Sequence, residues 1–240
     1  MKKIMILLVV LLTTLLVCTI SVQAISDTQI LENIDDYDSH FYQNKNLKTP
    51  NGEESYQIIE GSGKVLLTAP HTVNHIRKGR TKLREVCTGA YAEVLHDLTN
   101  APVIYMNYKD IDSNYYDDTE FKFALSNYLD EHPEIKIVFD MHGASSTRPF
   151  DIDLGTMNGK SLNNKWFLPY LMKRYFKREN IKDISFNHFS AAYQDTVTKF
   201  VSKRGLVAVQ IEINREFRCG EDEKTLDFVK SMKNIIERIN

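Results

Sequence analysis

The feature that most constrains the fold is an alternation of short apolar runs with longer amphipathic stretches. The apolar runs have the length of buried strands, and we predict strands at 64–68, 103–105, 135–140, 151–156 and 206–213. The longer stretches repeat apolar residues at three- and four-residue steps, and we predict helices at 83–98, 117–129, 163–178 and 226–239. Strands that alternate with helices indicate an α/β protein, a three-layer sandwich around a mostly parallel, mixed β-sheet.

The start of the chain has the pattern of an export signal. Lys2 and Lys3 precede an apolar stretch over residues 4–17, and Val22 and Ala24 stand at the positions that a signal peptidase reads. We predict that residues 1–24 are a signal peptide and that the protein is secreted or held in the cell envelope. An uncleaved anchor is the alternative, and only a retained leader would bring the chain into contact with a membrane.

The remainder of the chain fits one folded domain. Residues 25–55 are polar, and we predict an irregular lead-in there with one short helix near 28–34. Residues 56–240 are enough for a single α/β core.

A net charge of −2 without a basic stripe argues against a nucleic-acid partner. Two cysteines of this region, Cys87 and Cys219, do not make a disulfide framework, and the sequence leaves their pairing open.

Polar side chains stand at the carboxyl ends of several predicted strands. His71 follows the strand at 64–68, Asp140 and His142 follow the third strand, and Glu212 lies in the last one. Ligands of open α/β sheets gather outside the carboxyl ends of the strands, so we expect these side chains to meet. Strand alternation places Asp140 and His142 on the same face.

Two imidazoles and one carboxylate are a ligand set that zinc uses in hydrolases, with a further position left for water. His71, Glu85 and His142 can supply this set, with Glu85 expected at the start of the first predicted helix. Asp140 or Glu93 could replace Glu85 as the carboxylate ligand. Asp140 could instead orient a histidine from behind.

Glu212 is the candidate for the general base that a hydrolase needs to accept a proton from water and pass it to the leaving amine. It lies on an otherwise apolar strand, where an unpaired charge would be costly. A buried glutamate of this kind is expected either to pair with another polar group or to serve a function. Alternation places it on one face of the strand with Gln210 and Asn214.

At these residues the sequence resembles the N-formylglutamate amidohydrolase family, which is related in fold and metal site to zinc carboxypeptidases. The matching pieces occur in the family's order and are residues 67–71 (Leu-Thr-Ala-Pro-His), Glu85, residues 139–143 (Phe-Asp-Met-His-Gly) and residues 210–214 (Gln-Ile-Glu-Ile-Asn). The resemblance implies a zinc-carboxypeptidase-like fold with one Zn²⁺ per chain on His71, Glu85 and His142. It also implies that Glu212 is the general base.

Arginines are candidates for holding a substrate carboxylate, because a guanidinium can meet a carboxylate with two parallel hydrogen bonds. The candidates are Arg77, Arg148 and Arg215. Among the remaining histidines, we predict that His75 is a solvated loop residue. His188 is predicted to lie in a packed loop, with a substrate contact as the alternative.

These residues predict that 56–240 is a single α/β metallohydrolase domain. The predicted activity is that of an exported, zinc-dependent amidohydrolase, which cleaves an amide bond of an N-acyl amino acid or a small peptide. A metallocarboxypeptidase or a cell-wall peptide amidase would use the same site. The alternative of a different class is an inactive exported protein that binds a ligand at an inherited site. The sequence leaves the substrate and the oligomeric state open.

Overall fold

Seven strands form one sheet in the order β1-β5-β2-β6-β9-β7-β8. The computed structural model describes residues 25–218 and 222–240. The strands are β1 (Tyr56–Ile59), β2 (Val65–Ala69), β5 (Val103–Met106), β6 (Ile137–Ala144), β7 (Ile152–Gly155), β8 (Ile184–Phe186) and β9 (Val207–Asn214). A separate two-stranded hairpin consists of β3 (His75–Arg77) and β4 (Arg80–Lys82).

The central strands β5, β2, β6 and β9 run parallel, so their carboxyl ends meet at one edge of the sheet. β1 pairs antiparallel with β5 on one side, and β7 pairs antiparallel with β9 on the other. β8 then runs parallel to β7. The mostly parallel, mixed sheet predicted from the sequence is confirmed.

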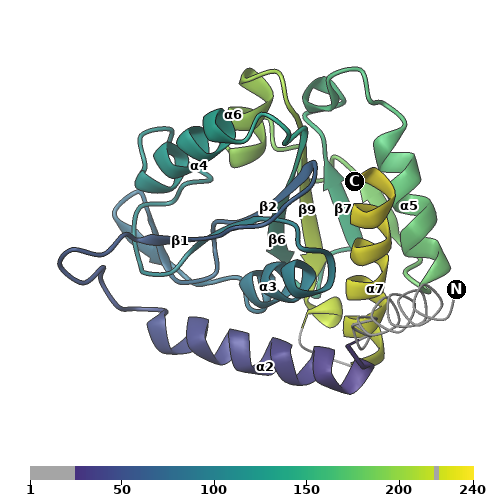
Figure 1. Cartoon of the computed structure of the whole chain (residues 1–240), viewed down its shortest axis with the longest axis horizontal. Helices are drawn as coiled ribbons and strands as arrows, with labels where there is room; N and C mark the ends of the chain where they lie inside the picture. Colours follow the sequence, from purple (N-terminus) through teal and green to yellow (C-terminus); the bar gives the residue numbers. More distant parts are fainter. Residues whose placement is uncertain (1–24, 219–221) are drawn as a thin grey trace, which may run out of the picture.

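Helices cover both faces of this sheet and complete three layers (Figure 1). One face carries α3 (Thr88–Thr99), α5 (Leu168–Arg178) and α7 (Asp222–Ile239), and the other carries α4 (Glu120–Glu131) and α6 (Val197–Lys203). Two short 3-10 turns are η1 (Lys160–Leu162) and η2 (Arg215–Phe217). Because crossovers between parallel strands place helices on the faces, the predicted three-layer α/β sandwich follows from the strand order and is confirmed.

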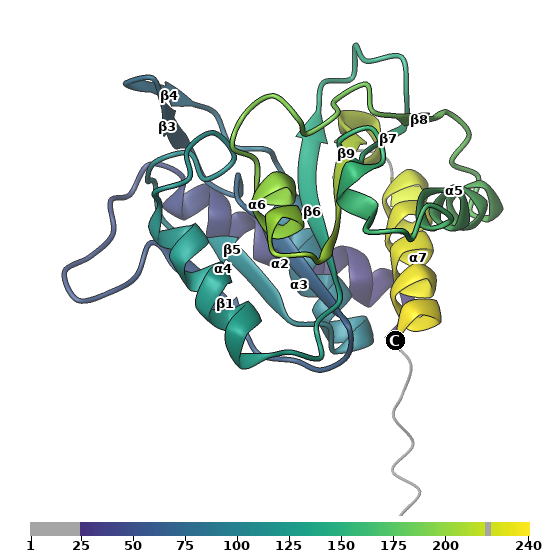
Figure 2. The ribbon, with the colours of Figure 1, turned by 90° about the horizontal axis from the view of Figure 1, so that it is seen from above.

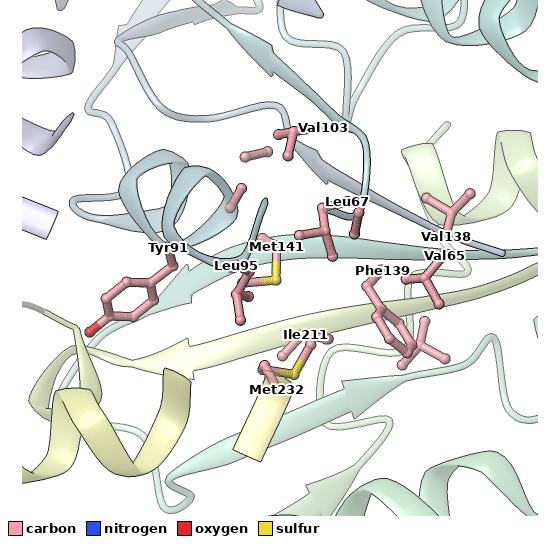
Figure 3. Close-up of a cluster of buried hydrophobic side chains, with 14 of the residues drawn as sticks. Val65, Leu67, Tyr91, Leu95, Val103, Val138, Phe139, Met141, Ile211 and Met232 are labelled. Carbon is pink, nitrogen blue, oxygen red and sulfur yellow. The ribbon is translucent and has the colours of Figure 1, made fainter. Parts of the chain in front are cut away.

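The core lies between the central strands and the helices α3 and α7. Figure 3 shows Leu95 of α3, Met141 of β6 and Met232 of α7 within one cluster, and all three are fully buried. β2 is buried at every position, which explains why it is a continuous apolar run instead of an alternating one. A core packed on both sides of β2, β6 and β9 holds the ends of these strands in place.

Residues 25–55 are more regular than the irregular lead-in predicted from the sequence, and the short helix predicted near 28–34 is part of a longer one. An 18-residue helix, α2 (Asp27–Asn44), begins after Ser26, whose side chain caps it, and packs across α3 and α7. Its buried residues Ile30, Ile34 and Phe41 form an apolar stripe that the polar composition hides. Truncating a buried phenylalanine costs about 3–5 kcal/mol, so α2 is an integral part of the domain.

Three predicted helices begin later than expected, and the one predicted at 117–129 begins at Glu120. The helix predicted at 83–98 begins at Thr88, so Glu85 lies in the preceding loop and not on the helix. α5 begins at Leu168 with Pro169 in its first turn, where the missing N–H leaves no hydrogen bond unmade.

The leader predicted at residues 1–24 lies outside the described residues, and so does Cys219. Within 25–218 and 222–240, no helix combines the length and the apolar character needed to cross a bilayer. Export therefore stays a prediction from the sequence.

Candidate metal centre

The carboxyl ends of β2, β6 and β9 bring the predicted site residues together. His71 lies two residues beyond β2, His142 lies near the end of β6, and Glu212 lies near the end of β9. β6 and β9 pair in a register that sets His142 directly opposite Glu212. The ladder between the two strands therefore fixes the separation of these side chains.

Glu85 reaches the same edge from a loop tied to the end of β2. Its main-chain N–H donates to the carbonyl of His71 at 2.8 Å. Its carboxylate then bridges two imidazoles, with Oε1 at 2.9 Å from His71 Nδ1 and Oε2 at 3.1 Å from His142 Nδ1. Oε2 also accepts the main-chain N–H of Gly143 at 2.9 Å. The three predicted ligands thus converge, with both Nδ1 atoms on one carboxylate.

The opposite nitrogen of each imidazole faces another buried carboxylate. His71 Nε2 lies 2.8 Å from Asp112 Oδ1, and His142 Nε2 lies 3.2 Å from Asp140 Oδ2. Asp140 is itself held by the hydroxyl of Thr68 at 3.0 Å. A carboxylate behind a metal-binding histidine fixes the ring and raises its basicity. Asp140 thus occupies the position from which it can orient His142.

Solved structures share this fold, although no protein-family model and no curated protein matches the chain. An N-formylglutamate amidohydrolase from Ralstonia eutropha JMP134 aligns with a TM-score of 0.53 at 12% identity, over 77% of this chain and 98% of that one. The chain has the fold of an N-formylglutamate amidohydrolase.

Two further solved structures are similar to this chain. A gene product of Agrobacterium tumefaciens has a TM-score of 0.57 at 14% identity, over 78% of this chain and 95% of that one. A bacteriophage poly-gamma-glutamate hydrolase has a TM-score of 0.50 at 15% identity, over 80% of this chain and 91% of that one. At these identities the likeness is one of fold, and the fold implied by the sequence motifs is confirmed.

The electrostatics of the site favour two charged imidazoles when no metal is bound. Burial works to lower the pKa of His71, but Glu85 and Asp112 outweigh it and raise the pKa to about 9. Against the same effect of burial, Asp140 and Glu85 raise the pKa of His142 well above its ordinary value. Although burial opposes it, the two rings hold the pKa of Glu85 well below its usual range. A divalent cation would take the place of these two protons.

Within the described residues, two groups of side chains could hold a metal ion, and both contain His71. In each group the potential ligand atoms lie within 4.8 Å of one another. The groups are His71 with Glu85 and His142, and His71 with His75 and Asp112.

The two carboxylates differ in their other partners. Asp112 accepts a hydrogen bond from Arg77 Nε at 2.5 Å and another from the main-chain N–H of Asn114 at 2.9 Å. Its charge is therefore already balanced by a permanent cation. Glu85 forms no ion pair with an arginine or lysine among the described residues, and Arg218 acts on it only across a longer distance, so its group fits a metal ion better.

Glu212 lies beside this group on β9. Gln210 donates from Nε2 to Glu212 Oε1 at 2.9 Å and so orients the carboxyl group. Burial raises the pKa of Glu212 to about 7, with His142 and His71 opposing and Glu85 adding to the shift. A carboxyl group with a pKa near neutrality can both accept and return a proton at pH 7.

A pocket of about 410 Å³ opens over the carboxyl ends of the strands. Its lining includes the predicted ligands and base, His71, Glu85, His142 and Glu212. The rest of the lining comes largely from the loops at 143–148 and 188–196. Pockets of this size accommodate small organic ligands.

Two of the predicted arginines line the pocket. Arg148 holds its guanidinium 4.8 Å from the ring centre of Phe189 and forms no ion pair within the described residues, so it is available to a substrate anion. Arg77 also lines the pocket but is paired with Asp112. Arg215 is exposed and is not among the residues described around the pocket.

Three other residues complete the surroundings. His75 is not the solvated residue predicted, because it is 5% exposed and stacks on His71 with ring centres 4.0 Å apart. Burial and the neighbouring His71 lower the pKa of His75 to about 3. His188 lines the pocket, and a contact between it and a substrate stays a prediction. No sequence pattern marks Asp112, which only tertiary packing places behind His71.

Proposed function

We propose that this protein is an exported, zinc-dependent amidohydrolase that cleaves an amide bond of an N-acyl amino acid or a small peptide. The observation that carries the proposal is the convergence of His71 Nδ1, His142 Nδ1 and the Glu85 carboxylate at a pocket. The similar solved structures, named as an N-formylglutamate amidohydrolase and a poly-gamma-glutamate hydrolase, support the hydrolysis of amides. Fold alone would not suffice, since one fold hosts many activities.

Zinc on His71, Glu85 and His142 would polarise the substrate carbonyl and lower the pKa of a water molecule. Glu212 accepts the proton of that water and passes it to the leaving nitrogen. Gln210 keeps the Glu212 carboxyl group in place through its hydrogen bond.

The substrate is proposed to carry a carboxylate near the scissile amide. Both named hydrolases act, by their names, on amides of glutamate. Arg148 supports the same property here, because its unpaired guanidinium lines the pocket and can bind a carboxylate through two hydrogen bonds. An exported enzyme would meet such groups in peptides and cell-wall fragments.

The metal content of the purified chain tests the proposal, with wild type measured beside His142→Ala. We expect about one zinc per wild-type chain and almost none in the variant, because a catalytic zinc site uses three protein ligands. The zinc-loaded chain is then screened against N-formylglutamate, N-acetylglutamate, γ-glutamyl peptides and neutral peptides of equal length. Release of free amine from the acidic substrates supports the proposal.

Two results would contradict it. A wild-type chain that takes up no metal even after zinc is supplied would remove the mechanism. Tight binding of an acidic peptide without turnover, by a chain that contains zinc, would favour an exported binding protein instead.

A further inference from the structure

Arg218 is a buried arginine, 7% exposed, that follows η2 and hydrogen-bonds three main-chain carbonyls. Its Nε donates to Ile213 at 2.8 Å, Nη1 donates to Val86 at 2.6 Å and Nη2 donates to Ala144 at 2.8 Å. The three acceptors belong to segments that are far apart in the sequence. A planar guanidinium with five N–H groups in fixed directions is suited to hold several segments at once.

The three carbonyls lie within two residues of Glu85, His142 and Glu212 in the sequence. Arg218 therefore joins the loop of Glu85, the end of β6 and the end of β9. It is not among the residues described around the pocket. Its hydrogen bonds reach these segments through their main chain, and its charge also acts across space on the carboxylates of Glu85 and Glu212.

Gly143 leaves the space that this guanidinium occupies. A Cβ atom on Gly143 would lie 2.4 Å from Cζ and 2.5 Å from Nη1 of Arg218. These separations are shorter than any ordinary carbon contact, and three hydrogen bonds restrain the guanidinium from moving aside. The buried arginine thus accounts for the glycine that follows His142.

We propose that Arg218 is a positioning residue that holds the segments of Glu85, His142 and Glu212 together for metal binding and proton transfer. This inference rests on the proposed function. It predicts that disturbing Arg218 weakens zinc binding before it unfolds the domain.

The test compares Arg218→Lys and Arg218→Ala with wild type and with Arg204→Ala, a matched arginine on the turn before β9. Zinc affinity is measured by competition with a chromophoric chelator, and thermal unfolding is followed on the same samples. We expect Arg218→Lys to bind zinc about 10- to 100-fold more weakly, the loss typical of groups that orient metal ligands. Arg204→Ala should keep the wild-type zinc affinity. An Arg218→Lys chain with wild-type zinc affinity would overturn the inference.

Hydrogen–deuterium exchange of the chains without metal gives a readout that does not depend on zinc. We expect exchange in Arg218→Lys to rise together at 84–88, 142–145 and 212–215 and to stay at the wild-type level in α4. A uniform rise through the domain, or no rise at these segments, would overturn the positioning role. A wild-type chain without zinc affinity would overturn the proposed function. The exchange data would still show whether Arg218 holds these three segments together.

The variant Gly143→Ala tests in a second way whether the position of the Arg218 guanidinium affects zinc binding. It should weaken zinc binding in the wild-type background and do so less in an Arg218→Ala background, because the atoms that its Cβ meets are gone. Arg218→Lys replaces Arg218→Ala in this cycle if the alanine variant does not fold. Equal losses in both backgrounds would contradict the link between the two residues.

A separate observation concerns the charge of α5 and the segment before it. Residues 154–178 contain no aspartate or glutamate, whereas the chain as a whole has a net charge of −2. The cations of this segment are Lys160, Lys165, Lys173, Arg174, Lys177 and Arg178. Such an asymmetry favours an anionic partner.

Exposed aromatic rings accompany this charge at the start of α5. Trp166, Phe167 and Tyr170 are 71%, 49% and 64% exposed. A hollow of about 480 Å³ lies beside them at the amino end of the strands, with Leu168 and Leu171 among its apolar residues. Its cations are Lys64, Lys136, Lys165 and Arg238, and no carboxylate side chain is among the described residues that line it.

We infer that this basic–aromatic surface, made of Lys64, Lys136, Lys165, Trp166, Phe167, Tyr170 and Arg238, docks on a bilayer that contains anionic lipids. Cations attract anionic headgroups, and amphipathic rings settle at the level of the headgroups. The surface lies at the end of the sheet opposite the pocket, since β6 points away from the C-terminal end of α7 (Figure 2). Docking would therefore leave the pocket open to solvent.

Trp166 is the one tryptophan of the chain, so its emission reports directly on this surface. We expect a blue shift with vesicles of phosphatidylcholine and phosphatidylglycerol, a smaller shift with phosphatidylcholine alone, and reversal by salt. Lys165→Glu with Arg238→Glu should abolish the shift, whereas Lys82→Glu on β4 should not. No shift with anionic vesicles, or the same shift with soluble polyglutamate, would overturn the inference.

Discussion

His71 belongs to two groups of potential metal ligands that differ in the surroundings of their carboxylates. On one side, the Glu85 side chain is 22% exposed and meets only imidazoles and a main-chain N–H. On the other side, Asp112 is completely buried and is paired with Arg77. The two groups have similar separations between their ligand atoms but differ in the partners of their carboxylates. A partly accessible carboxylate that is in no ion pair with an arginine or lysine can bind a metal, whereas a buried carboxylate that is paired with an arginine can support the metal-binding ring.

The largest expected effect comes from Glu85→Gln, which removes the charged ligand while keeping the shape of the side chain. We expect the zinc content to fall from about one per chain to almost none, with loss of turnover, because zinc prefers a carboxylate to an amide oxygen. Elemental analysis beside the surface control Glu131→Gln measures this. If the Glu85→Gln chain keeps its zinc, the metal is bound instead by the group of His71, His75 and Asp112.

The variant Glu212→Gln tests whether turnover can be lost while the metal site of His71, Glu85 and His142 stays intact. We expect kcat to fall by about 10²–10⁴-fold, the usual contribution of a general base, while the zinc content stays at the wild-type level. Steady-state kinetics with metal analysis of the same samples decide the matter, with Glu216→Gln as the control. Undiminished turnover would remove Glu212 from its proposed role.

The variant Asp112→Asn tests whether Asp112 supports His71 from behind instead of binding the metal itself. We expect about 10- to 100-fold weaker zinc affinity, with full occupancy recovered at high zinc, because Asp112 orients His71 without serving as a ligand. Chelator competition measures the affinity, and the exposed Asp118→Asn serves as a control. Zinc that cannot be restored at any concentration would show that Asp112 is itself a ligand.

The pH dependence sharpens the comparison further. Because the folded, metal-free chain raises the pKa of His71 from 6.5 to about 9, this stabilisation is complete below pH 6.5 and is lost as the pH rises through 9. Zinc must displace the same proton, so its apparent affinity should rise by about tenfold per pH unit for each proton displaced over that range. Thermal unfolding of the metal-free chain and zinc titrations at pH 6.5, 7.5 and 8.5 should therefore show opposite trends. Parallel trends would mean that zinc binds without displacing protons.

The smallest effect is expected for His75→Phe. Phenylalanine keeps the stacking on His71 and removes both ring nitrogens, so zinc affinity should change by less than the tenfold or so that an orienting partner contributes. A chelator titration is sufficient to measure it. Loss of zinc in this variant alone would identify the group of His71, His75 and Asp112 as the metal site.

The sequence was sufficient to predict the layers of the fold and the meeting of His71, His142 and Glu212. These residues follow from local rules, because buried strands are apolar runs and the ends of parallel strands share one edge. Glu85 was placed near the site but on the wrong element. Its loop is held by a hydrogen bond to His71, and no periodicity in the sequence reports such a contact.

Other parts of the molecule could not be predicted in the same way. The sequence indicated only a short helix near 28–34 within α2, because the stripe of Ile30, Ile34 and Phe41 is diluted by polar residues. Asp112 and Arg218 stand in irregular stretches, and their partners are brought to them only by the finished fold. Long-range hydrogen bonds of this kind leave no pattern along the chain.

The pairing of His142 with Glu212 has a consequence for how this protein can change. Because these residues are neighbours across the β6–β9 ladder, their separation is a property of the main chain. Another part of the pocket lining comes from loop residues such as Tyr193 and Gln194. Evolution, or a mutant library restricted to that loop, can therefore alter the shape of the pocket while His142 and Glu212 keep their spacing.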